Sequence, residues 1–416
     1  MKATHTPRVR QRAELTYKYN LQSGRHGWLR LTPAYSIKVV KDVLAATPGA
    51  TRVFDPFSGT ATTTLCAAER GLVAHSIDIN PFLVWLGNAK LAAYTPAQLD
   101  EVARLGDAAA RAATCAGAKA VAPPPLHRID RWWSPEALRF LCALKAELEH
   151  RAGDDARCRD LLMIAFCKTM MRLSNADFGH QSMSFKDRQK RTSAQPELDA
   201  RPDFRQVFAA DLTTIVDSAS PPPTGSGQVL SSDSRTLDAL DLGAEPDLLI
   251  TSPPYPNRMS YIRELRPYLY WLGYLQQSRE AGELDWQAIG GTWGIATSRL
   301  ACWERDDAVA MPAYLAPILD KIRAAHGKNG PLMANYVSKY FEDMARHLER
   351  VRGLLAPGAD VHYIIGNSSF YGHLVPAERL YADLMTDLGY RNVGVRVLRK
   401  RNSKKELYEF DVFATR

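Results

Sequence analysis

A strand-like run that ends in Ser-Pro-Pro-Tyr is the segment best suited to chemistry. Residues 247–255 are Asp-Leu-Leu-Ile-Thr-Ser-Pro-Pro-Tyr. Two prolines stop a strand, because they cannot donate to the sheet and their φ is fixed. The Ser252 hydroxyl and the prolyl carbonyls could then accept from a planar ring that carries an amine, and Tyr255 could stack on that ring. The alternative is a plain strand followed by a Pro-Pro turn.

A second segment, residues 53–63, is typical of a strand, a small-residue turn and a helix opening. Gly59 would let the backbone approach a ligand where a Cβ would clash, and the threonines at 60–64 offer hydroxyls to cap the helix. The next strand, residues 73–77, ends in Asp78, where a Rossmann-type fold holds ribose hydroxyls. Because no Gly-x-Gly-x-x-Gly is present, the turn is poorly suited to bind the pyrophosphate of a dinucleotide. The pattern fits a nucleoside without phosphates, of which S-adenosylmethionine is the common example.

Together, the two segments resemble those of the amino-methylating DNA methyltransferases. These enzymes transfer a methyl group from S-adenosylmethionine to the exocyclic nitrogen of cytosine or adenine. Residues 55–61 are similar to the family's cofactor loop, and residues 251–255 are similar to its catalytic tetrapeptide. The loop departs from the family at Ala61, where a second glycine is usual. We expect the loop to keep its conformation with alanine at this position. The property that the alanine could change is the affinity for the cofactor.

The resemblance implies a role for individual residues. The catalytic residues would be Ser252, Pro253, Pro254 and Tyr255. The residues that bind S-adenosylmethionine would be Thr32, Pro33, Asp55, Pro56, Phe57, Ser58, Gly59, Thr60, Asp78, Ile79, Asn80, Asp233, Ser234 and Thr251. Among these, Thr32 and Pro33 belong to a segment that would pack over the methionine end, and Asp233 would reach the adenine amine. An Asp at position 233 could equally cap a helix. No metal site is assigned.

The reaction class follows from the cysteines and from Ser252. Methylation of cytosine carbon 5 needs a cysteine thiolate that adds to the ring. The enzymes that methylate carbon 5 carry this cysteine directly after a proline, and no cysteine in this sequence follows a proline. An exocyclic amine can attack the methyl group directly once it is oriented, although a paired base must first be flipped out. In the resembling family a leading Ser favours cytosine N4, and a leading Asp or Asn favours adenine N6. Ser252 therefore favours cytosine, with N6-adenine as the alternative.

The pattern of elements predicts an α/β fold. Helices at 340–355 and 376–389 alternate with strands at 360–366, 391–400 and 406–414, which indicates a mostly parallel sheet covered on both faces. The linker between the last two strands is too short for a crossover helix, so they should form an antiparallel hairpin. The resemblance implies a Rossmann-like class I methyltransferase with a seven-stranded sheet. Its catalytic domain would comprise residues 1–94 and 228–416.

Two insertions would interrupt this domain. Residues 95–227 contain two helical segments, at 135–151 and 155–172, and a basic loop that is a candidate DNA-recognition region. A merely solvated face is the alternative for that loop. Trp132 and Trp133 are better explained as helix packing than as a wedge between bases. The second insertion, 275–330, follows an aromatic-rich helix, and its residues 286–329 could be a recognition loop. The candidate DNA-binding residues are Lys186, Arg188, Lys190, Arg191, Asn257, Arg258 and Tyr261.

Composition agrees with a nucleic-acid enzyme. The net charge of +8 and the sequence pI of about 9.1 suit a polyanionic partner. Six cysteines without a Cys-x-x-Cys pair are typical of reduced, structural residues. We find no run long and apolar enough to span a membrane and no apolar core of a signal peptide. We therefore expect a cytoplasmic, nucleoid-associated protein of a prokaryote or phage.

The expected partner is double-stranded DNA, with a cognate restriction endonuclease or a defence system as a further candidate. An RNA methyltransferase is one alternative, although no appended RNA-binding domain is recognisable. A non-catalytic nucleic-acid-binding protein with a methyltransferase fold is another, supported only by Ala61. A protein-glutamine methyltransferase would present similar geometry to an amide, but that group prefers Asn-Pro-Pro-Tyr.

Overall fold

One large sheet organises the molecule. The computed structural model describes residues 9–31, 34–177, 184–185, 203–237, 240–325, 327, 329–401 and 406–416. The strands of the large sheet are β1 (Arg52–Asp55), β2 (Val73–Asp78), β5 (Ser226–Ser231), β6 (Leu248–Thr251), β7 (Asp360–Gly366), β10 (Arg391–Lys400) and β11 (Tyr408–Thr415). Their order across the sheet is β10-β11-β7-β6-β1-β2-β5. Neighbours are parallel except that β11 is antiparallel to both β7 and β10.

This topology is that of the Rossmann-like class I methyltransferase fold, as predicted. The final strands form the expected antiparallel hairpin, and β11 lies between β7 and β10. The sheet grows from β1 in two directions, through β2 to β5 and through β6 to β7. The carboxyl ends of strands at such a switch point enclose a crevice that binds ligands in open α/β sheets. Asp55 ends β1 and Thr251 ends β6, so both stand at this point.

Side-chain alternation along the central strands supplies two separate cores. Val53 on β1 packs with residues of α1 (Ile37–Ala46) and α2 (Thr62–Glu69) on one face. Phe54, the next residue, packs with residues of α13 (Asn329–Leu354) and α14 (Ala377–Asp387) on the other. Successive strand residues point to opposite faces, so a sheet covered on both sides needs apolar residues at every position. The helix predicted at 340–355 thus forms part of a longer one that begins at Asn329.

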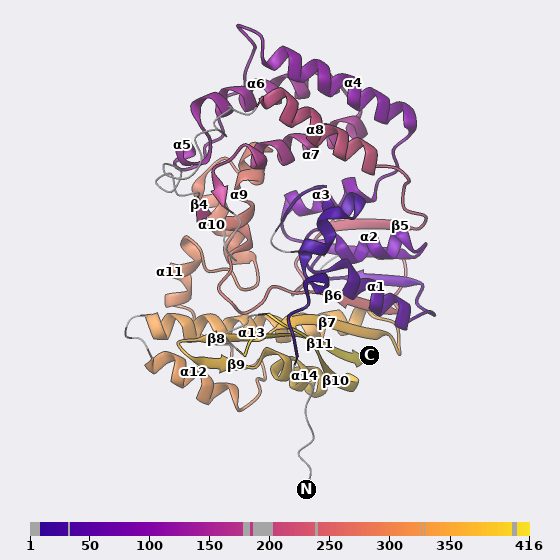
Figure 1. The fold of residues 1–416 in the computed structure, drawn as a ribbon. Helices are drawn as coiled ribbons and strands as arrows, with labels where there is room; N and C mark the ends of the chain where they lie inside the picture. Colours follow the sequence, from indigo (N-terminus) through magenta and orange to yellow (C-terminus); the bar gives the residue numbers. More distant parts are fainter. Residues whose placement is uncertain are drawn as a thin grey trace.

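The segment predicted as the first insertion forms a helical layer at the top of Figure 1. Its elements are α4 (Pro96–Ala113), α5 (Ile129–Trp132), α6 (Pro135–Ala152), α7 (Ala156–Arg172), the short strands β3 (Ala176–Asp177) and β4 (Ser184–Phe185), and α8 (Phe204–Ser218). These helices share one hydrophobic core with α3 (Pro81–Leu91) and α9 (Tyr261–Trp271). Trp132 and Trp133 are each 1% exposed, and the Trp133 ring meets the Trp271 ring edge-on with centroids 5.6 Å apart. Both tryptophans are therefore core residues, which contradicts a role as base wedges.

The second insertion differs from its prediction. Residues 286–329, predicted as a recognition loop, contain the end of α10 (Ser278–Gln287), all of α11 (Ile295–Ala301) and α12 (Leu315–Ala324), and the first residue of α13. The helices are short, and Gly290 and Gly294 separate the first two with positive φ. Such short segments show too few turns for a 3.6-residue period to stand out. A small hairpin of β8 (Ser368–Phe370) and β9 (His373–Val375) follows β7.

The N-terminal segment is built from short 3-10 turns rather than from a helix or strand. They are η1 (Ala13–Leu15), η2 (Tyr17–Gln22) and η3 (Gly24–Gly27). The Arg25 guanidinium anchors the segment, because Nη1 donates to the carbonyl oxygens of Lys90 (2.7 Å) and Ala92 (2.6 Å) at the end of α3. Within the described ranges, no helix is both long enough and apolar enough to cross a membrane.

Candidate functional site

A cavity of about 600 Å³ lies at the carboxyl ends of the central strands and gathers most of the predicted site. The predicted residues that line it are Pro56, Phe57, Gly59, Asp78, Ile79, Asn80, Asp233, Ser234, Ser252, Pro253, Pro254, Tyr255, Asn257 and Tyr261. The cofactor loop and the tetrapeptide are directly linked, since the Thr251 hydroxyl donates to Asp55 Oδ1 at 2.6 Å across 196 residues of sequence. The fold therefore brings the two motifs to one space.

The remaining predicted residues fall into three groups. Asp55, Ser58, Thr60 and Thr251 lie behind the cavity wall and are at most 4% exposed. Arg258 is exposed and does not line the cavity, although its backbone amide donates to the Tyr336 hydroxyl at 3.1 Å. Outside the described residues lie Thr32, Pro33, Lys186, Arg188, Lys190 and Arg191.

The cofactor loop is held by the buried carboxyl group of Asp55. Its Oδ1 accepts from the Thr251 hydroxyl and, at 3.0 Å, from the Phe57 amide. Burial raises the pKa of Asp55 to about 7, against the lowering effect of these hydrogen bonds. Its other oxygen, Oδ2, is buried and has no partner among the described residues. Buried polar atoms in proteins are nearly always hydrogen-bonded, so Oδ2 is an acceptor available to a ligand or a water molecule.

The turn into α2 explains why the loop tolerates Ala61. Gly59 has φ +50°, and Ala61 has φ +58° in the left-handed region. Ala61 is the residue that precedes the first turn of α2, so the threonine hydroxyls do not cap this helix as predicted. A left-handed alanine is strained by roughly 1–2 kcal/mol, and glycine would relieve that strain. The loop nevertheless keeps its course, because the Ala61 amide donates to the Ser58 carbonyl at 2.8 Å.

Asp78 connects the cofactor loop with the end of β2. Its Oδ2 accepts from the Gly59 amide at 3.0 Å, and its Oδ1 accepts from the Asn80 amide at 2.9 Å. Burial raises the pKa of Asp78 to about 6, although these amides favour its ionised form. Each carboxylate oxygen has two acceptor sites. Asp78 therefore lines the cavity with capacity left for two hydroxyl donors.

The donors and acceptors of this half of the cavity fit S-adenosylmethionine. The Asn80 side-chain amide nitrogen is buried and has no partner among the described residues, while its oxygen caps α3 by accepting from the Phe82 amide. Asn80 and Asp78 together offer the cavity one hydrogen-bond donor and several acceptors, beside the left-handed turn at Gly59. A nucleoside with ribose hydroxyls and a cationic methionine end matches this set. Asp78 and Asn80, which line the cavity, are the residues that would hold it, and Asp55 would support the loop from behind.

A buried lysine supports the same loop. The Lys90 side chain on α3 is 1% exposed, and its Nζ donates to the Thr60 carbonyl at 3.0 Å. Burial lowers the pKa of Lys90 to about 7. Between pH 7 and the ordinary lysine pKa of about 10.4, the unfolded chain thus binds more protons at this site than the folded chain. Stability should therefore rise with pH in this window, by up to about 1.4 kcal/mol for each pH unit.

We expect Lys90→Met to remove this dependence. Urea unfolding at pH 7 and pH 9 should show the wild-type free energy of unfolding rising by roughly 2 kcal/mol more than that of the variant. The exposed Lys321 on α12 provides the control, because Lys321→Met should change as the wild type does. Equal changes in wild type and Lys90→Met would show that Lys90 is charged in both states throughout the window.

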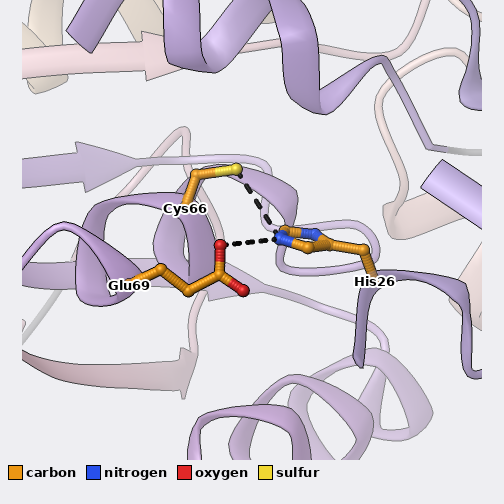
Figure 2. Close-up of side chains that lie close together, drawn as sticks. All are labelled: His26, Cys66 and Glu69. Carbon is orange, nitrogen blue, oxygen red and sulfur yellow. Dashed lines mark hydrogen bonds and ion pairs between the residues drawn. The ribbon is translucent and has the colours of Figure 1, made fainter. Parts of the chain in front are cut away.

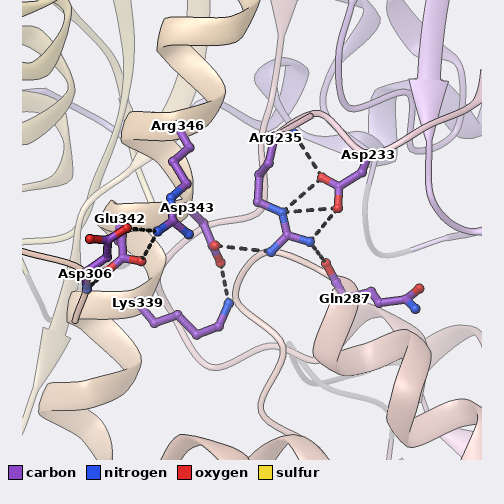
Figure 3. Close-up of polar contacts among 8 residues, drawn as sticks. All are labelled: Asp233, Arg235, Gln287, Asp306, Lys339, Glu342, Asp343 and Arg346. Atoms are coloured by element: carbon purple, nitrogen blue, oxygen red, sulfur yellow. Dashed lines mark hydrogen bonds and ion pairs between the residues drawn. The ribbon is translucent and has the colours of Figure 1, made fainter. Parts of the chain in front are cut away.

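Asp233, just after β5, also lines the cavity and is part of an ion-pair network (Figure 3). Its Oδ2 lies 2.5 Å from Arg235 Nη2, and Arg235 Nη1 reaches Asp343 of α13 at 3.1 Å. Arg235 also donates to the Gln287 carbonyl at 2.7 Å. Burial works to raise the pKa of Asp233, but the hydrogen bonds from Arg235 outweigh it and lower the pKa. Asp233 is therefore an ionised acceptor at the cavity wall, and it also accepts from the Arg235 amide as a local turn-former.

At the other end of the cavity, Ser252 is oriented as an acceptor. Its hydroxyl donates to the Ile364 carbonyl on β7 at 2.9 Å and lies 3.5 Å from the Tyr255 hydroxyl. A hydroxyl has one hydrogen and two lone pairs, so the bond to Ile364 directs the lone pairs of Oγ elsewhere. The Pro254 carbonyl is taken by the Tyr340 hydroxyl at 2.6 Å. The Ser252 oxygen and the Pro253 carbonyl thus remain as the acceptors for an incoming amine.

Sequence reasoning missed the residues that both ends of the described chain contribute to the cavity. The N-terminal segment contributes Gln11, Arg12, Ala13, Leu15, Thr16, Tyr17, Lys18 and Arg30, and the final hairpin contributes Arg399, Arg401 and Glu409. Gln287, Ala288 and Ile289, between α10 and α11, form a further part of the wall. None of these segments carries a motif. The alternation of charged residues in the hairpin, Arg399 and Glu409 included, was the one available signal.

A polar cluster of His26, Cys66 and Glu69 lies outside the cavity (Figure 2). His26 Nε2 is 3.4 Å from Glu69 Oε2 and 3.7 Å from Cys66 Sγ. Burial raises the pKa of the Cys66 thiol and lowers the pKa of His26, while metals bind the thiolate. Lys41 and Lys90 also act on His26 electrostatically, which disfavours a further cation. We interpret the cluster as a contact between η3 and α2.

Comparison with known proteins gives a partial likeness. No family model matches the chain. Type II methyltransferase M.MvaI from Kocuria varians is 24% identical over 166 residues, which are 39% of this chain and 35% of that protein. The chain thus matches about a third of the length of this relative, and the likeness supports a methyltransferase.

Solved structures add little to this. Two structures of the rRNA methyltransferase aviRa from Streptomyces viridochromogenes align with 92% and 96% of this chain and with 86% and 92% of theirs. Their TM-scores are 0.27 and 0.29, and their identities are 9% and 11%. Such low scores decide nothing about the substrate.

Proposed function

We propose that this protein is an S-adenosylmethionine-dependent methyltransferase that acts on the exocyclic amine of a nucleic-acid base. The observation that carries the proposal is the common cavity: an acid-lined nucleoside site and an oriented amine acceptor share one wall at the topological switch point. The partial likeness to a type II methyltransferase points the same way. No covalent catalyst is required, because an amine can attack the methyl group directly.

In this proposal the cofactor supplies an activated methyl group on a sulfonium, and the chain positions what meets it. Asp78 accepts from the ribose hydroxyls and keeps Gly59 and Asn80 in place through their amides. Asp233 accepts from the adenine amine while Arg235 fixes its carboxylate. Asp55, held by Thr251, lies beneath the loop at the methionine end. The negative charge of these carboxylates favours binding of the positively charged sulfonium cofactor.

The amine side depends on Ser252 and Pro253. The Ser252 oxygen accepts one amine hydrogen because its own hydrogen is donated to Ile364, and the Pro253 carbonyl accepts the other. Positive charge develops on the nitrogen as the methyl group is transferred, and prepositioned acceptors stabilise that charge without reorganisation. The methylated nitrogen then loses one proton to water, which leaves a neutral N-methyl amine on the base. Tyr255 stacks on the flipped base.

We propose cytosine N4 in double-stranded DNA as the target. The choice of cytosine rests on the leading Ser252 of the tetrapeptide, and the choice of DNA rests on the resemblance of both motifs. Under this proposal the helical layer of residues 95–227 is the recognition region, and Lys186, Arg188, Lys190 and Arg191 contact phosphates. A cognate nuclease or defence system would be a further partner.

The test is mass spectrometry of nucleosides from a methylation-free host that expresses the protein. DNA and RNA should be digested separately, and a host that expresses Ser252→Ala provides the matched control. We expect N4-methylcytosine in DNA with the wild type and its loss with the variant. N6-methyladenine in DNA would support the mechanism but change the target base from cytosine to adenine. A methylated amine found only in RNA would change the proposed substrate from DNA to RNA. No new nucleoside in either polymer would contradict the proposal.

A further inference from the structure

A buried carboxylate of the final hairpin contacts the tyrosine of the tetrapeptide. Glu409 on β11 is 5% exposed, and its Oε1 accepts from the Tyr255 hydroxyl at 2.9 Å. From the other side, Arg399 on β10 donates to Oε2 through Nε at 2.7 Å and to Oε1 through Nη2 at 3.1 Å. A buried charge is tolerated when it is paired and hydrogen-bonded. Glu409 meets this condition with Tyr255 as one of its two donor residues.

Strand register explains how these side chains meet. Arg399 faces Glu409 across β10 and β11, and Glu409 faces Gly366 across β11 and β7. A Cβ on Gly366 would lie 2.2 Å from Arg401 Nη1 and 3.0 Å from Tyr255 Cδ2, so a larger residue there would displace the guanidinium and press on the ring. The Arg401 guanidinium carbon lies 4.9 Å from the centroid of the Tyr255 ring, and Arg401 Nη1 donates to the Asn367 carbonyl at 2.9 Å. The ring is thus held at its hydroxyl and packed against a guanidinium.

We propose that Glu409, oriented by Arg399, is a positioning residue for the target base. It fixes the Tyr255 hydroxyl and thereby the plane in which the ring stacks on the base whose amine meets Ser252. The inference rests on the proposed function and extends it from the two recognised motifs to the hairpin. A reacting group displaced by about an ångström loses much of its rate. Glu409 therefore acts on turnover through Tyr255, while the nucleoside half of the cavity does not depend on it.

The hairpin offers a closely matched control. Asp411 lies two residues after Glu409 on the same strand and is 0% exposed. It pairs with Arg396, which faces it on β10 at 2.5 Å, and with His362 at 3.1 Å. Asp411 is thus a second buried carboxylate paired with an arginine of β10. Asp411 does not line the cavity that contains Ser252 and Asp78.

The experiment compares methyl transfer by Glu409→Gln, Tyr255→Phe, their combination and Asp411→Asn, with the nucleic acid that the wild type modifies. We expect Glu409→Gln and Tyr255→Phe each to lower kcat by about tenfold, the scale of one hydrogen bond to a charged group. The double variant should lose no more than Tyr255→Phe alone, because the hydrogen bond that Glu409→Gln weakens is already absent from that background. Affinity for S-adenosylmethionine, measured by calorimetry, should stay within about twofold, and Asp411→Asn should keep the wild-type kcat.

Other outcomes separate the inference from the proposed function. If Glu409→Gln lowers kcat no more than Asp411→Asn, or if the effects of Glu409→Gln and Tyr255→Phe multiply, the inference is wrong while the methyltransferase stands. If the wild type transfers no methyl group to DNA or RNA, both are wrong. Should Glu409→Gln fail to fold, Arg399→Gln replaces it in the same cycle. Its effect should likewise vanish in the Tyr255→Phe background, and persistence there would overturn the inference.

Discussion

Ser252→Ala should lower kcat for methyl transfer by about 100- to 1000-fold, the scale seen when one prepositioned polar group is removed from a charge-stabilising site. The structure gives the reason. The hydroxyl hydrogen is committed to the Ile364 carbonyl, so the oxygen faces the amine as an acceptor. Alanine removes that acceptor and leaves the nucleoside half of the cavity unchanged. Affinity for S-adenosylmethionine should therefore stay within about twofold by calorimetry.

The control for this variant is Ser231→Ala, which changes an exposed serine at the end of the edge strand β5, outside the cavity. It should retain wild-type turnover. Loss of cofactor affinity in Ser252→Ala to the same degree as loss of turnover would show that Ser252 acts in cofactor binding or in folding. The assigned role would then be withdrawn.

Asp78→Ala should weaken binding of S-adenosylmethionine by about 10- to 100-fold, since a hydrogen bond to a charged group contributes about 1.5–3 kcal/mol. The variant removes the proposed ribose acceptor and also the anchor of the Gly59 and Asn80 amides. Asp78→Asn supplies one acceptor in place of two and should show an intermediate affinity. The exposed Asp42 on α1 provides the control, because Asp42→Ala should bind like the wild type.

The pKa of Asp78 adds a pH test of the same assignment. Burial raises this pKa to about 6, so the carboxylate is protonated as the pH falls below 6. Protonation converts one acceptor oxygen into a donor, and affinity for the cofactor should decrease from pH 7 to pH 5. Asp78→Asn cannot titrate and should show a flatter profile over this range. An equally steep decrease in Asp78→Asn would assign the pH dependence to another group, of which Asp55, with a pKa raised to about 7, is the nearest under the same loop.

Much of the fold follows from local sequence patterns. The strands that carry the motifs were placed within one or two residues, because apolar runs end at Asp55, Asp78 and Ser252 with unmistakable breaks. The hairpin followed from a linker too short for a crossover. The helices of the second insertion were missed, since each is short and their packing, rather than their periodicity, makes them helical.

The site was predictable only where a motif marks it. The cofactor loop and the tetrapeptide are continuous in sequence, so their residues could be named. The partners of Tyr255 could not, because Glu409 lies 154 residues away and its position depends on strand register. Lys90 was missed for a related reason: a lysine on an apolar helix is ordinarily exposed, and only the tertiary structure shows that it is buried against the Thr60 carbonyl.

The position of β11 has a consequence for synthesis. β10 leaves the ribosome before β11, but it is joined to the rest of the sheet only through β11. Tyr255 thus waits for Glu409 while 154 further residues are translated, which takes about 8–30 s at 5–20 residues per second. During this interval a nascent chain can already form the half of the cavity that contains Asp78 and Asn80, but Tyr255 lacks its hydrogen bond to Glu409. Under the proposed function, a newly made molecule reaches full turnover only when β11 docks on β7.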